Sequence, residues 1–474
     1  MGVYPRAAGS APKHGILKAA MTAPDTIVAI STPPGRGGIG IVRLSGPEAV
    51  EIAQQLLSLQ QPLQHAHARF TKVLDDASAT IDEAIVTAFF APSSYTGEDL
   101  VEIAAHGSPV VLDYIVRRAL ALGSQSGARL AEPGEFSRRA FLAGRLDLTQ
   151  AEAIHDLIAA QTLAQARTAA QQLGGALSRR VAPIKQQLVF LIAMLEAGMD
   201  FASGELDDVD TMPTARIAAS IEAVRAPLAA LAASFRFGSI QRNGVRLALV
   251  GRPNAGKSSL FNRLLDRDRA IVTATPGTTR DTIEETFSLE GIPIRLVDTA
   301  GLRSASAADE AEALGIARSR EALAEADLIL FIRDATDLSP HETSLEPLLR
   351  DRPIIRVSNK VDLLPHIEHA SDDILTSART GQGLETLRAA ILARLRAGSA
   401  GAEEGALNNL RQHQAVSAAL TALEAANNAN SDSLPHELLL VDLHAALAAL
   451  DTLTGTTTTD DILALIFSTF CIGK

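Results

Sequence analysis

Hydrophobic and polar positions follow two different periods along the chain, and the places where the period changes mark the expected domains. Residues 26 to about 120 hold short runs of β-branched and apolar residues, among them TIVAIS and IDEAIVTAFF, and end in the helical pattern PVVLDYIVRRALAL. From Thr149 the apolar residues recur at helical spacing, and a further helix is expected near ARIAASIEAVRAPLAALAASF. The first part of the chain is therefore predicted to be a small α+β unit that leads into long, packed helices.

Strands and helices alternate from 245 to about 397, and helical patterns return from about 406 to 470. This alternation predicts a largely parallel sheet covered by helices. We therefore expect a multidomain α/β protein in which an α/β domain is inserted into a helical domain whose two halves meet in space. The expected parts are a disordered tail or misplaced start at 1–21, an α+β domain at 22–140, the first helical part at 141–240, the α/β domain at 241–397, and the second helical part with a C-terminal cysteine motif at 398–474.

Composition limits the cellular compartments and the classes of binding partner that we expect for this protein. The single cysteine, Cys471, excludes an intramolecular disulfide, and the longest strongly apolar run, 188–195, is shorter than the roughly 18 residues that a membrane-spanning helix needs. We expect a cytoplasmic protein without a membrane segment. The formal net charge of −12 argues against a protein that coats nucleic acid nonspecifically, although it leaves room for one basic face.

The stretch GRPNAGKSS carries the pattern G-x-x-x-x-G-K-S, with Gly251, Gly256, Lys257 and Ser258 placed between a strand-like run and a helical one. Backbone N–H groups of such a loop wrap a β-phosphate, the lysine reaches the β- and γ-phosphates, and the serine hydroxyl can bind Mg²⁺. The sequence therefore predicts a nucleoside triphosphate site.

Later motifs indicate which base this site accepts. Asp298 ends an apolar run in IRLVDTAG, where a carboxylate can hold the Mg²⁺ shell and Gly301 can approach a γ-phosphate. Asp362, in SNKVD, can accept hydrogen bonds from N1–H and the exocyclic amine of guanine, a donor pair that adenine does not present. The stretch TSARTG (376–381) can close the base pocket through backbone N–H groups. SNKVD alone could equally be a surface turn, but its order after the other two motifs favours guanine.

Together, GRPNAGKSS, TATPGTTRD, DTAGLR and the terminal FCIGK resemble the motifs of the tRNA-modification GTPase family called MnmE or TrmE, over essentially all of 22–474. The resemblance implies a folate-binding α+β domain, a discontinuous all-α domain and an inserted Ras-like P-loop G domain. It implies Mg²⁺ on Ser258 and Thr279. It implies GTP binding by Asn254, Ala255, Gly256, Lys257, Ser258, Ser259, Thr273, Thr278, Thr279, Asp298, Thr299, Ala300, Gly301, Asn359, Lys360, Asp362, Ser377 and Ala378.

Hydrolysis has to be organised without the glutamine that follows D-x-x-G in Ras-like enzymes, because Leu302 stands there and offers no hydrogen bond. The resemblance implies a K⁺ ion that supplies positive charge beside the phosphates. The K⁺ ligands that it implies are Asn254, Thr273, Thr275 and Thr278. It also implies that Glu312, with Glu310 as the alternate, is the catalytic residue that orients the attacking water, although either could be a solvated helix charge.

The segment GRGGIG (35–40) satisfies the dinucleotide fingerprint G-x-G-x-x-G, but the strand-like IVRLSG follows it where a helix should open. We therefore reject a Rossmann fold and expect a glycine-rich turn between strands, close to another backbone or a flat ligand. The family resemblance implies that this domain forms a homodimer and binds a tetrahydrofolate derivative (5-formyl or 5,10-methylene). The matching folate positions are Arg43, Glu102, Arg145 and Lys474.

Cys471 follows the apolar pattern DDILALIFSTF and lies close to the end of the chain. A lone cysteine is commonly buried and inert, but the apolar pattern can anchor the tail, and Lys474 would lie near the thiol. We therefore expect Cys471 to act as a nucleophile or one-carbon acceptor, with a buried structural thiol as the alternative.

The resemblance implies a GTP hydrolase that works on tRNA in a heterotetramer with the flavoprotein MnmG, which would hold the FAD. The pair would add an aminomethyl-type group (carboxymethylaminomethyl) to C5 of the wobble uridine of certain tRNAs. The alternative is a regulatory GTPase that binds RNA or ribosomes without modification chemistry. That alternative gives no role to the folate-like domain or to the terminal cysteine.

Overall fold

The computed structural model describes residues 25–202, 212–252, 254–265, 284–298, 326–337, 353–364, 373–396, 404–456, 463 and 466–473. Contacts divide the chain into two compact units, one of Met1–His155 with Asp451–Lys474 and one of Asp156–Leu450. The tail or misplaced start predicted at 1–21 lies outside the described residues.

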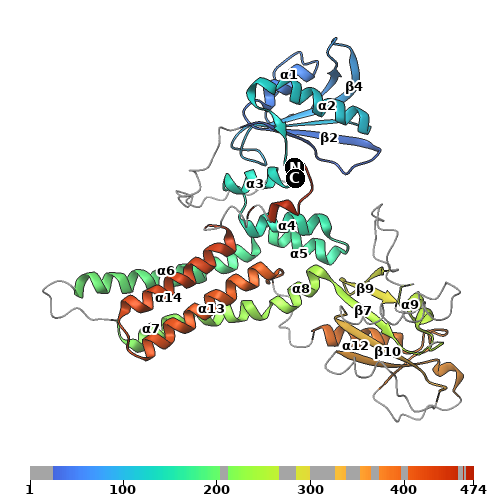
Figure 1. The fold of residues 1–474 in the computed structure, drawn as a ribbon, viewed down its shortest axis with the longest axis vertical. Coiled ribbons are helices and arrows are strands. Elements are labelled where there is room, and N and C mark those ends of the chain that lie inside the picture. Colours follow the sequence, from blue (N-terminus) through green and yellow to red (C-terminus); the bar gives the residue numbers. More distant parts are fainter. Residues whose placement is uncertain are drawn as a thin grey trace, which may run out of the picture. The chain divides into compact units, whose positions relative to one another are not determined.

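A six-stranded sheet with the order β3-β4-β5-β2-β1-β6 forms the centre of the first unit (Figure 1). Its strands are β1 (Ile27–Ile30), β2 (Gly37–Ser45), β3 (Arg69–Leu74), β4 (Thr80–Phe89), β5 (Leu100–Gly107) and β6 (Arg129–Leu130). All described pairs are antiparallel except β1 with β6. Helices α1 (Ala49–Leu56) and α2 (Pro109–Leu122) share the apolar core with one face of the sheet, so the predicted α+β unit is confirmed.

The glycine-rich segment 35–40 differs from its prediction. It is not only a turn, because Gly37 begins β2, and the register of β2 against β5 is irregular between Gly37 and Gly40. The expected close approach of another backbone is present, since a Cβ atom on Gly107 of β5 would lie 2.6 Å from the carbonyl oxygen of Gly37. The strand that follows GRGGIG therefore starts inside the glycine run, which agrees with the rejection of a Rossmann fold.

The end of the chain returns to this first unit. The rings of Phe467 and Phe470 lie 5.4 Å apart, and Phe467 also packs against Phe141 of α3 (Glu135–Leu142) at 6.5 Å. Phe467 and Phe470 are both buried. Among the described residues, Phe467 and Phe470 therefore anchor the tail, which agrees with the expectation from the sequence.

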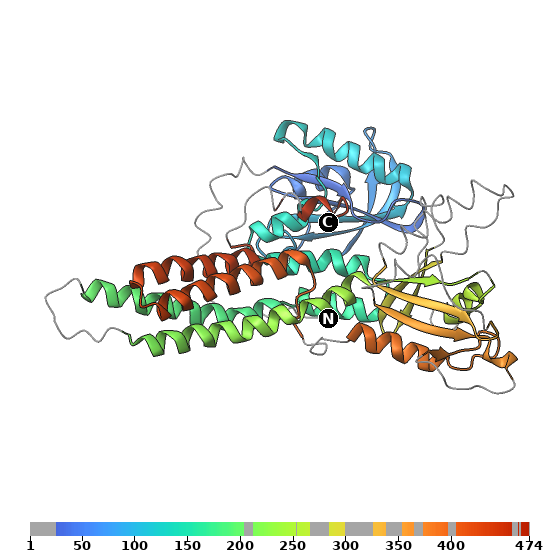
Figure 2. The same ribbon diagram turned by 60° about the horizontal axis from the view of Figure 1, so that its bottom comes forward.

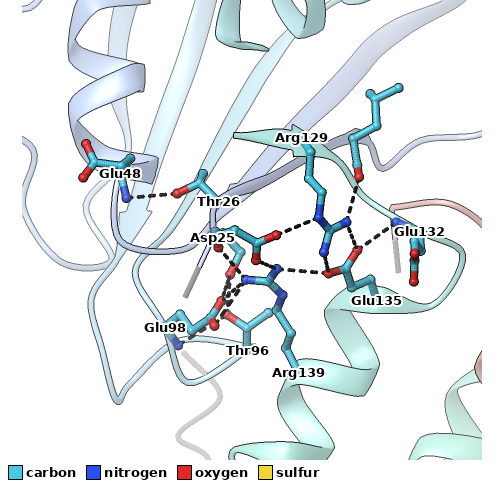
Figure 3. Close-up of polar contacts among 11 residues, drawn as sticks. Asp25, Thr26, Glu48, Thr96, Glu98, Arg129, Glu132, Glu135 and Arg139 are labelled. Carbon is cyan, nitrogen blue, oxygen red and sulfur yellow. Dashed lines mark hydrogen bonds and ion pairs between the residues drawn. The ribbon is translucent and has the colours of Figure 1, made fainter. Parts of the chain in front are cut away.

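An ion-pair network joins the start of β1 to β6 and to α3 (Figure 3). Asp25 accepts hydrogen bonds from Arg129 and Arg139, each at 2.6 Å, and Glu135 accepts from the same two arginines at 2.5 and 3.0 Å. Glu98 contacts Arg139 at 3.1 Å. The side chains of Glu135 and Arg139 are only 6% and 11% exposed, so removal of one partner would leave a poorly solvated charge.

The network predicts a loss of stability in acid. Burial raises the pKa of Asp25 and of Glu135, but hydrogen bonds and ion pairs with Arg129 and Arg139 lower each pKa by more, so both lie below their ordinary values of 3.8 and 4.5. A depressed folded-state pKa contributes stability above the ordinary value, and this contribution is lost as the pH falls through the folded-state pKa. We expect the urea midpoint of the first unit to fall below about pH 4.5.

The double variant Asp25→Asn, Glu135→Gln tests this origin of the acid sensitivity. It should be less stable than the unmodified chain at pH 7, on the order of 1–3 kcal/mol for each lost carboxylate, and its midpoint should change less with pH. Urea unfolding between pH 7 and 3.5 measures both. An unchanged pH profile in the variant would assign the acid sensitivity to other carboxylates.

Helices from two distant parts of the chain lie side by side in the second unit. Helices α5 (Leu163–Leu173), α6 (Ala176–Ala202), α7 (Thr214–Ala233) and α8 (Phe235–Asn243) follow α4 (Leu148–Ala159) and precede the α/β domain, whereas α13 (Leu410–Ser431) and α14 (His436–Thr454) come after it. Figures 1 and 2 show the last two, in red, along α6 and α7, in green. Asn430 Nδ2 donates to Thr214 O (3.0 Å) and Gln172 Nε2 to Ala406 O (2.7 Å). The expected meeting of the two helical halves is confirmed.

Two described stretches, Ala176–Met199 and Thr214–Asn243, are long and apolar enough to cross a membrane by length and composition alone, with mean hydropathies of 1.2 and 1.3. The sequence prediction considered the shorter run 188–195 and missed both. Because core helices of water-soluble proteins pass the same test, two such stretches are weak evidence for a membrane span.

The α/β domain is built on a second six-stranded sheet, with the order β12-β11-β10-β7-β9-β8. Its strands are β7 (Val245–Val250), β8 (Glu284–Leu289), β9 (Ile292–Asp298), β10 (Leu328–Asp334), β11 (Ile354–Asn359) and β12 (Ile374–Leu375). All described pairs are parallel except β8 with β9. Helices α9 (Lys257–Leu265) and α12 (Leu384–Arg396) share the core with the apolar residues of the sheet. The predicted, largely parallel sheet is confirmed.

Candidate nucleotide-binding site

The nucleotide motifs gather at one edge of this sheet. The P-loop follows β7, SNKVD begins at the end of β11, and TSARTG follows β12, so all three lie where parallel strands end. The neighbours of β7 are β9 on one side and β10 on the other, which makes β7 a point where the chain switches direction across the sheet. Open α/β sheets bind ligands outside the carboxyl ends of their strands at such a point.

Lys257 is the first residue of α9, and the P-loop leads directly into this helix. Its Nζ donates hydrogen bonds to the carbonyl oxygens of Gly251 and Arg252, both at 2.8 Å. The ammonium is therefore held across the loop at a helix N-terminus, where it can meet a phosphate group. Ser258 and Ser259 are exposed in the same first turn, from which a hydroxyl can bind Mg²⁺. Asn254, the P-loop residue proposed for K⁺, is also exposed.

Asn359 joins the P-loop to the base-binding loops. Its Nδ2 donates to Ala255 O at 3.0 Å, and its Oδ1 accepts from the backbone N–H of Ala378 at 3.1 Å. Asn359 is 1% exposed, so these bonds form away from water. Gly256 has a φ of 87°, and a Cβ atom there would lie 2.2 Å from Asn359 Nδ2. The glycine of the motif is thus required both by its backbone conformation and by this contact.

Two contacts support the residues expected to read the base. Ser377 Oγ donates to Asp362 Oδ1 at 2.6 Å, which fixes one carboxylate oxygen. Lys360 has a φ of 68°, and its Nζ lies 2.7 Å from Asp334 Oδ2. Burial raises the pKa of Asp334, but hydrogen bonds from Lys360 and Thr336 lower it below its ordinary value. Sequence reasoning missed Asp334, although its place at the end of an apolar strand was visible in LILFIRDAT.

Several predicted residues lie outside the described residues. They are Thr273, Thr275, Thr278, Thr279, Thr299, Ala300, Gly301, Leu302, Glu310, Glu312 and Lys474. Asp298 is described as the last residue of β9, at the same sheet edge as the P-loop. Among the described residues, no group of three or more His, Cys, Asp or Glu could hold a metal ion. The described part of the site is therefore the phosphate loop and the base pocket.

A second group of predicted residues meets in the first unit. Arg43 donates to Glu102 Oε1 from Nε at 3.0 Å and from Nη2 at 2.7 Å, and its guanidinium lies 5.7 Å from the ring centre of Tyr95 and 5.5 Å from that of Phe136. A third bond runs from Arg43 Nη1 to the carbonyl oxygen of Gly473 at 3.2 Å. The C-terminal tail therefore lies beside the Arg43–Glu102 pair.

Further contacts, most of them to the backbone, fix the C-terminal tail beside the Arg43–Glu102 pair. Gly473 O also accepts from Ser31 Oγ at 2.9 Å, and Ile472 pairs with Pro133 in an antiparallel bridge. A Cβ atom on Gly473, whose φ is 96°, would lie 2.4 Å from Ile30 O. Cys471 is a free cysteine and is exposed, so its thiol is not buried as the structural alternative expected, and its chemical role stays a prediction. Sequence reasoning missed Ser31, because no local pattern links it to a residue 442 positions away.

Arg145 is exposed, and its Nη1 donates to Pro92 O at 3.0 Å. It therefore contacts the loop that carries Tyr95, the residue whose ring faces Arg43. The described contacts unite Arg43, Glu102 and the tail, and they connect Arg145 to the same loop. This arrangement can present a carboxylate oxygen and a cation to a flat, polar ligand.

Two family models match the chain. Residues 26–145 match the model described as GTP-binding protein TrmE N-terminus, and residues 148–471 match the one described as MnmE helical domain. The second match spans the α/β domain as well as both helical parts, which agrees with an inserted domain.

Similar proteins share the description tRNA modification GTPase MnmE. The Koribacter versatilis protein is 54% identical over 464 residues, which cover 96% of this chain and 100% of that protein. The Thiobacillus denitrificans protein is 44% identical, with 95% of this chain and 98% of that protein covered. The Aquifex aeolicus protein is 40% identical, with 95% and 100% covered.

Two similar solved structures each cover part of this chain. Aquifex aeolicus Era bound to GDP and AlF4⁻ is 28% identical over 38% of this chain and 66% of that chain, with a TM-score of 0.26. The G domain of the T. maritima FeoB iron transporter is 29% identical over 32% of this chain and 98% of that chain, with a TM-score of 0.24.

Proposed function

This chain belongs to the MnmE family of tRNA modification GTPases, and from that premise we propose that it couples GTP hydrolysis to modification of the wobble uridine of certain tRNAs. The proposed product carries a carboxymethylaminomethyl-type group on C5. The flavoprotein MnmG is the proposed partner, in a heterotetramer that supplies FAD, and the cytoplasm is the proposed compartment. The proposed modification chemistry depends most on the position of the C-terminal tail. The carbonyl oxygen of Gly473 in this tail accepts hydrogen bonds from Arg43 and Ser31.

The proposed roles in GTP hydrolysis follow from the positions at the sheet edge. Lys257 and the N-terminus of α9 would hold the phosphates, and Asp362 would accept from guanine. Ser258 fits a Mg²⁺ ligand because its hydroxyl is exposed at that helix N-terminus, with Thr279 as the second proposed ligand. K⁺ is proposed at Asn254 with the threonines of 273–278, and Glu312 is proposed to orient the water.

The Arg43–Glu102 pair fits a reduced folate. The two hydrogen bonds that Arg43 donates to Glu102 both reach Oε1, and within the described part of the chain Oε2 has no hydrogen-bond partner. The side chain of Glu102 is 28% exposed, so Oε2 can accept N–H groups from a pterin. A bound methylenetetrahydrofolate would supply the one-carbon unit. Arg145 and Lys474 are the proposed partners of its glutamyl tail, and Cys471 is the proposed nucleophile or one-carbon acceptor.

A homodimer is supported by the face of the first sheet opposite α1 and α2. In the strand register Phe70 pairs with Ile85, Ile85 with Ala104, and Ala104 with Ile41, so an apolar row crosses four strands. Phe70 is 65% exposed and Ile85 is 50% exposed. Contiguous exposed apolar surface of this kind marks interaction sites, and we propose a second copy of this chain as its occupant.

Nucleoside analysis tests the proposed function. A strain that lacks this chain should lose the modified wobble uridine from its tRNA, and the restored chain should return it. If the purified chain hydrolyses GTP but the strain that lacks it keeps an unchanged nucleoside profile, the regulatory GTPase is favoured instead.

The proposed K⁺ ligand set predicts the salt dependence of hydrolysis. With no glutamine after D-x-x-G, we expect hydrolysis to be at least about tenfold faster in KCl than in NaCl at matched ionic strength, because K⁺ would supply charge beside the phosphates. Asn254→Ala should remove most of this difference. Initial rates of phosphate release measure it, and equal rates in both salts would contradict the K⁺ site.

A further inference from the structure

The N-terminus of α5 makes an unusual set of contacts in the second unit. Thr162 and Gln165 form a capping box, in which Thr162 Oγ1 accepts from Gln165 N at 3.1 Å and Gln165 Oε1 accepts from Thr162 N at 3.1 Å. Such a pair usually satisfies only the exposed N–H groups of its own helix. Here Thr162 also reaches a backbone carbonyl of the α/β domain, and Gln165 reaches one in the last turn of α8, just before the chain enters that domain.

Each member of the capping box also donates one hydrogen bond to a backbone carbonyl oxygen near the start of a strand. Thr162 Oγ1 donates to Gly291 O at 2.8 Å, directly before β9, and Gln165 Nε2 donates to Arg242 O at 2.8 Å, three residues before β7. The hydroxyl therefore accepts one bond and donates another, whereas the amide oxygen of Gln165 accepts two, from Thr162 N and from Gln161 N, and its nitrogen donates one. Thr162 is 9% exposed, so its bonds are shielded from water.

A half-buried carboxylate, that of Asp156, makes further contacts at the same junction. Asp156 Oδ1 accepts from Arg242 Nε at 2.7 Å, and Asp156 Oδ2 accepts from Asn408 Nδ2 at 3.3 Å. Arg242 lies where the chain enters the α/β domain, and Asn408 lies where it has left that domain. Residues of the helical domain thus contact the segment that enters the α/β domain, the segment that leaves it, and the tip of the β8–β9 hairpin.

The opposite ends of that hairpin lead to residues that are proposed for the nucleotide site. β9 pairs along β7 and ends at Asp298, beside the P-loop edge, and β8 follows in the chain after TATPGTTRD. A strand of this length spans about 20 Å, and pairing with β7 and β8 holds β9 in register along it. A displacement of β9 at Asp298 can therefore reach Gly291, where Thr162 contacts the hairpin.

We infer that Thr162 and Gln165 are positioning residues that couple the β8–β9 hairpin to the helical domain, so that the nucleotide state of the α/β domain is transmitted into α5. This inference deepens the proposed function and rests on its GTPase part only. It places neither residue in contact with the nucleotide. The coupling runs through hydrogen bonds to Gly291 O and Arg242 O.

Two variants separate the bridge from the helix cap. Thr162→Val keeps the side-chain shape but removes both the cap and the bond to Gly291 O. Gln165→Glu still offers an oxygen acceptor for the cap, since Glu is a favoured residue at this position, and removes the donor to Arg242 O. Thr162→Ser keeps the hydroxyl and should behave as the unmodified chain. Asn409→Ala is the matched control, because Asn409 caps α13 through Gln412 N at 2.9 Å.

Hydrogen exchange of the α5 amides in the full chain is the readout, compared between GDP and GDP with aluminium fluoride in potassium buffer. The unmodified chain, Thr162→Ser and Asn409→Ala should show a nucleotide-dependent difference. In Thr162→Val and Gln165→Glu this difference should fall about fivefold, the factor that one net hydrogen bond supplies. The KM for GTP should stay within about threefold in all of them, because the nucleotide contacts are intact.

Each other outcome decides against the inference. A nucleotide-dependent difference that persists in Gln165→Glu and Thr162→Val, or that is missing from the unmodified chain, overturns the coupling. Loss of the difference in Asn409→Ala as well would assign it to general loosening of the helices. Fluorescent GDP binding is measured first, because a chain that binds no guanine nucleotide would contradict the proposed GTPase function rather than the coupling.

Discussion

Asp362→Asn should lower the affinity for GTP by at least about a hundredfold and shift the preference toward xanthosine triphosphate. A carboxylate accepts two hydrogen bonds from the N1–H and exocyclic amine of guanine, and charged hydrogen bonds in a closed pocket contribute about 1.5–3 kcal/mol each. Ser377 Oγ holds Oδ1 of Asp362 at 2.6 Å, so the carboxylate is oriented before the base arrives. The amide of asparagine can instead donate to the C2 oxygen of xanthine. Equilibrium titration with fluorescent nucleotides measures both constants.

Asp327→Asn is the matched control for this substitution. Asp327 precedes β10 at the amino end of the strand, away from the nucleotide edge, and accepts from Arg246 N at 2.8 Å. The same chemical change there should leave nucleotide preference unaltered. An Asp362→Asn chain that keeps its GTP affinity, or an unmodified chain that binds ATP equally well, would overturn the guanine assignment.

Cys471→Ser should lower wobble-uridine modification by at least about a thousandfold while GTP hydrolysis continues, because serine nearly keeps the shape of the thiol but is a far weaker nucleophile at neutral pH. Cys471 is exposed in a tail that Arg43, Ser31 and Pro133 seat by hydrogen bonds and a backbone bridge. Nucleoside analysis of tRNA from the complemented strain measures modification, and phosphate release measures hydrolysis.

Two further substitutions in the tail show whether the thiol acts from its seated position. Thr469→Ser changes an exposed residue nearby, whose hydroxyl bonds to Ile466 O at 2.7 Å, and should modify tRNA normally. Gly473→Ala retains the thiol but would place a Cβ atom 2.4 Å from Ile30 O, so it should displace the tail and reduce modification. Full modification by Cys471→Ser would make the thiol dispensable and return the tail to a structural role.

The sequence was sufficient where a feature depends on residues close together in the chain. The P-loop pattern around Lys257 identifies a phosphate site because one loop and one helix start supply all its groups, and the structure places that lysine across this loop. Helical spacing and the alternation of strands and helices predicted the inserted α/β domain for the same reason. The short β6 and the helix α1 were not anticipated, because packing on the sheet decides such weak local patterns.

Contacts between distant residues required the tertiary structure. Asn359 could be assigned to the nucleotide site from SNKVD, but its bond to Ala255 O depends on β11 and β7 ending at the same sheet edge. Thr162 and Gln165 form a readable capping-box pattern, yet no local signal points from them to Gly291 or Arg242. The seat of the tail joins Ser31 to Gly473 across 442 positions. The sequence by itself therefore determined which chemical groups this protein carries, and the folded chain decided which of them meet, because a hydrogen bond depends on distance in space and not on separation along the chain.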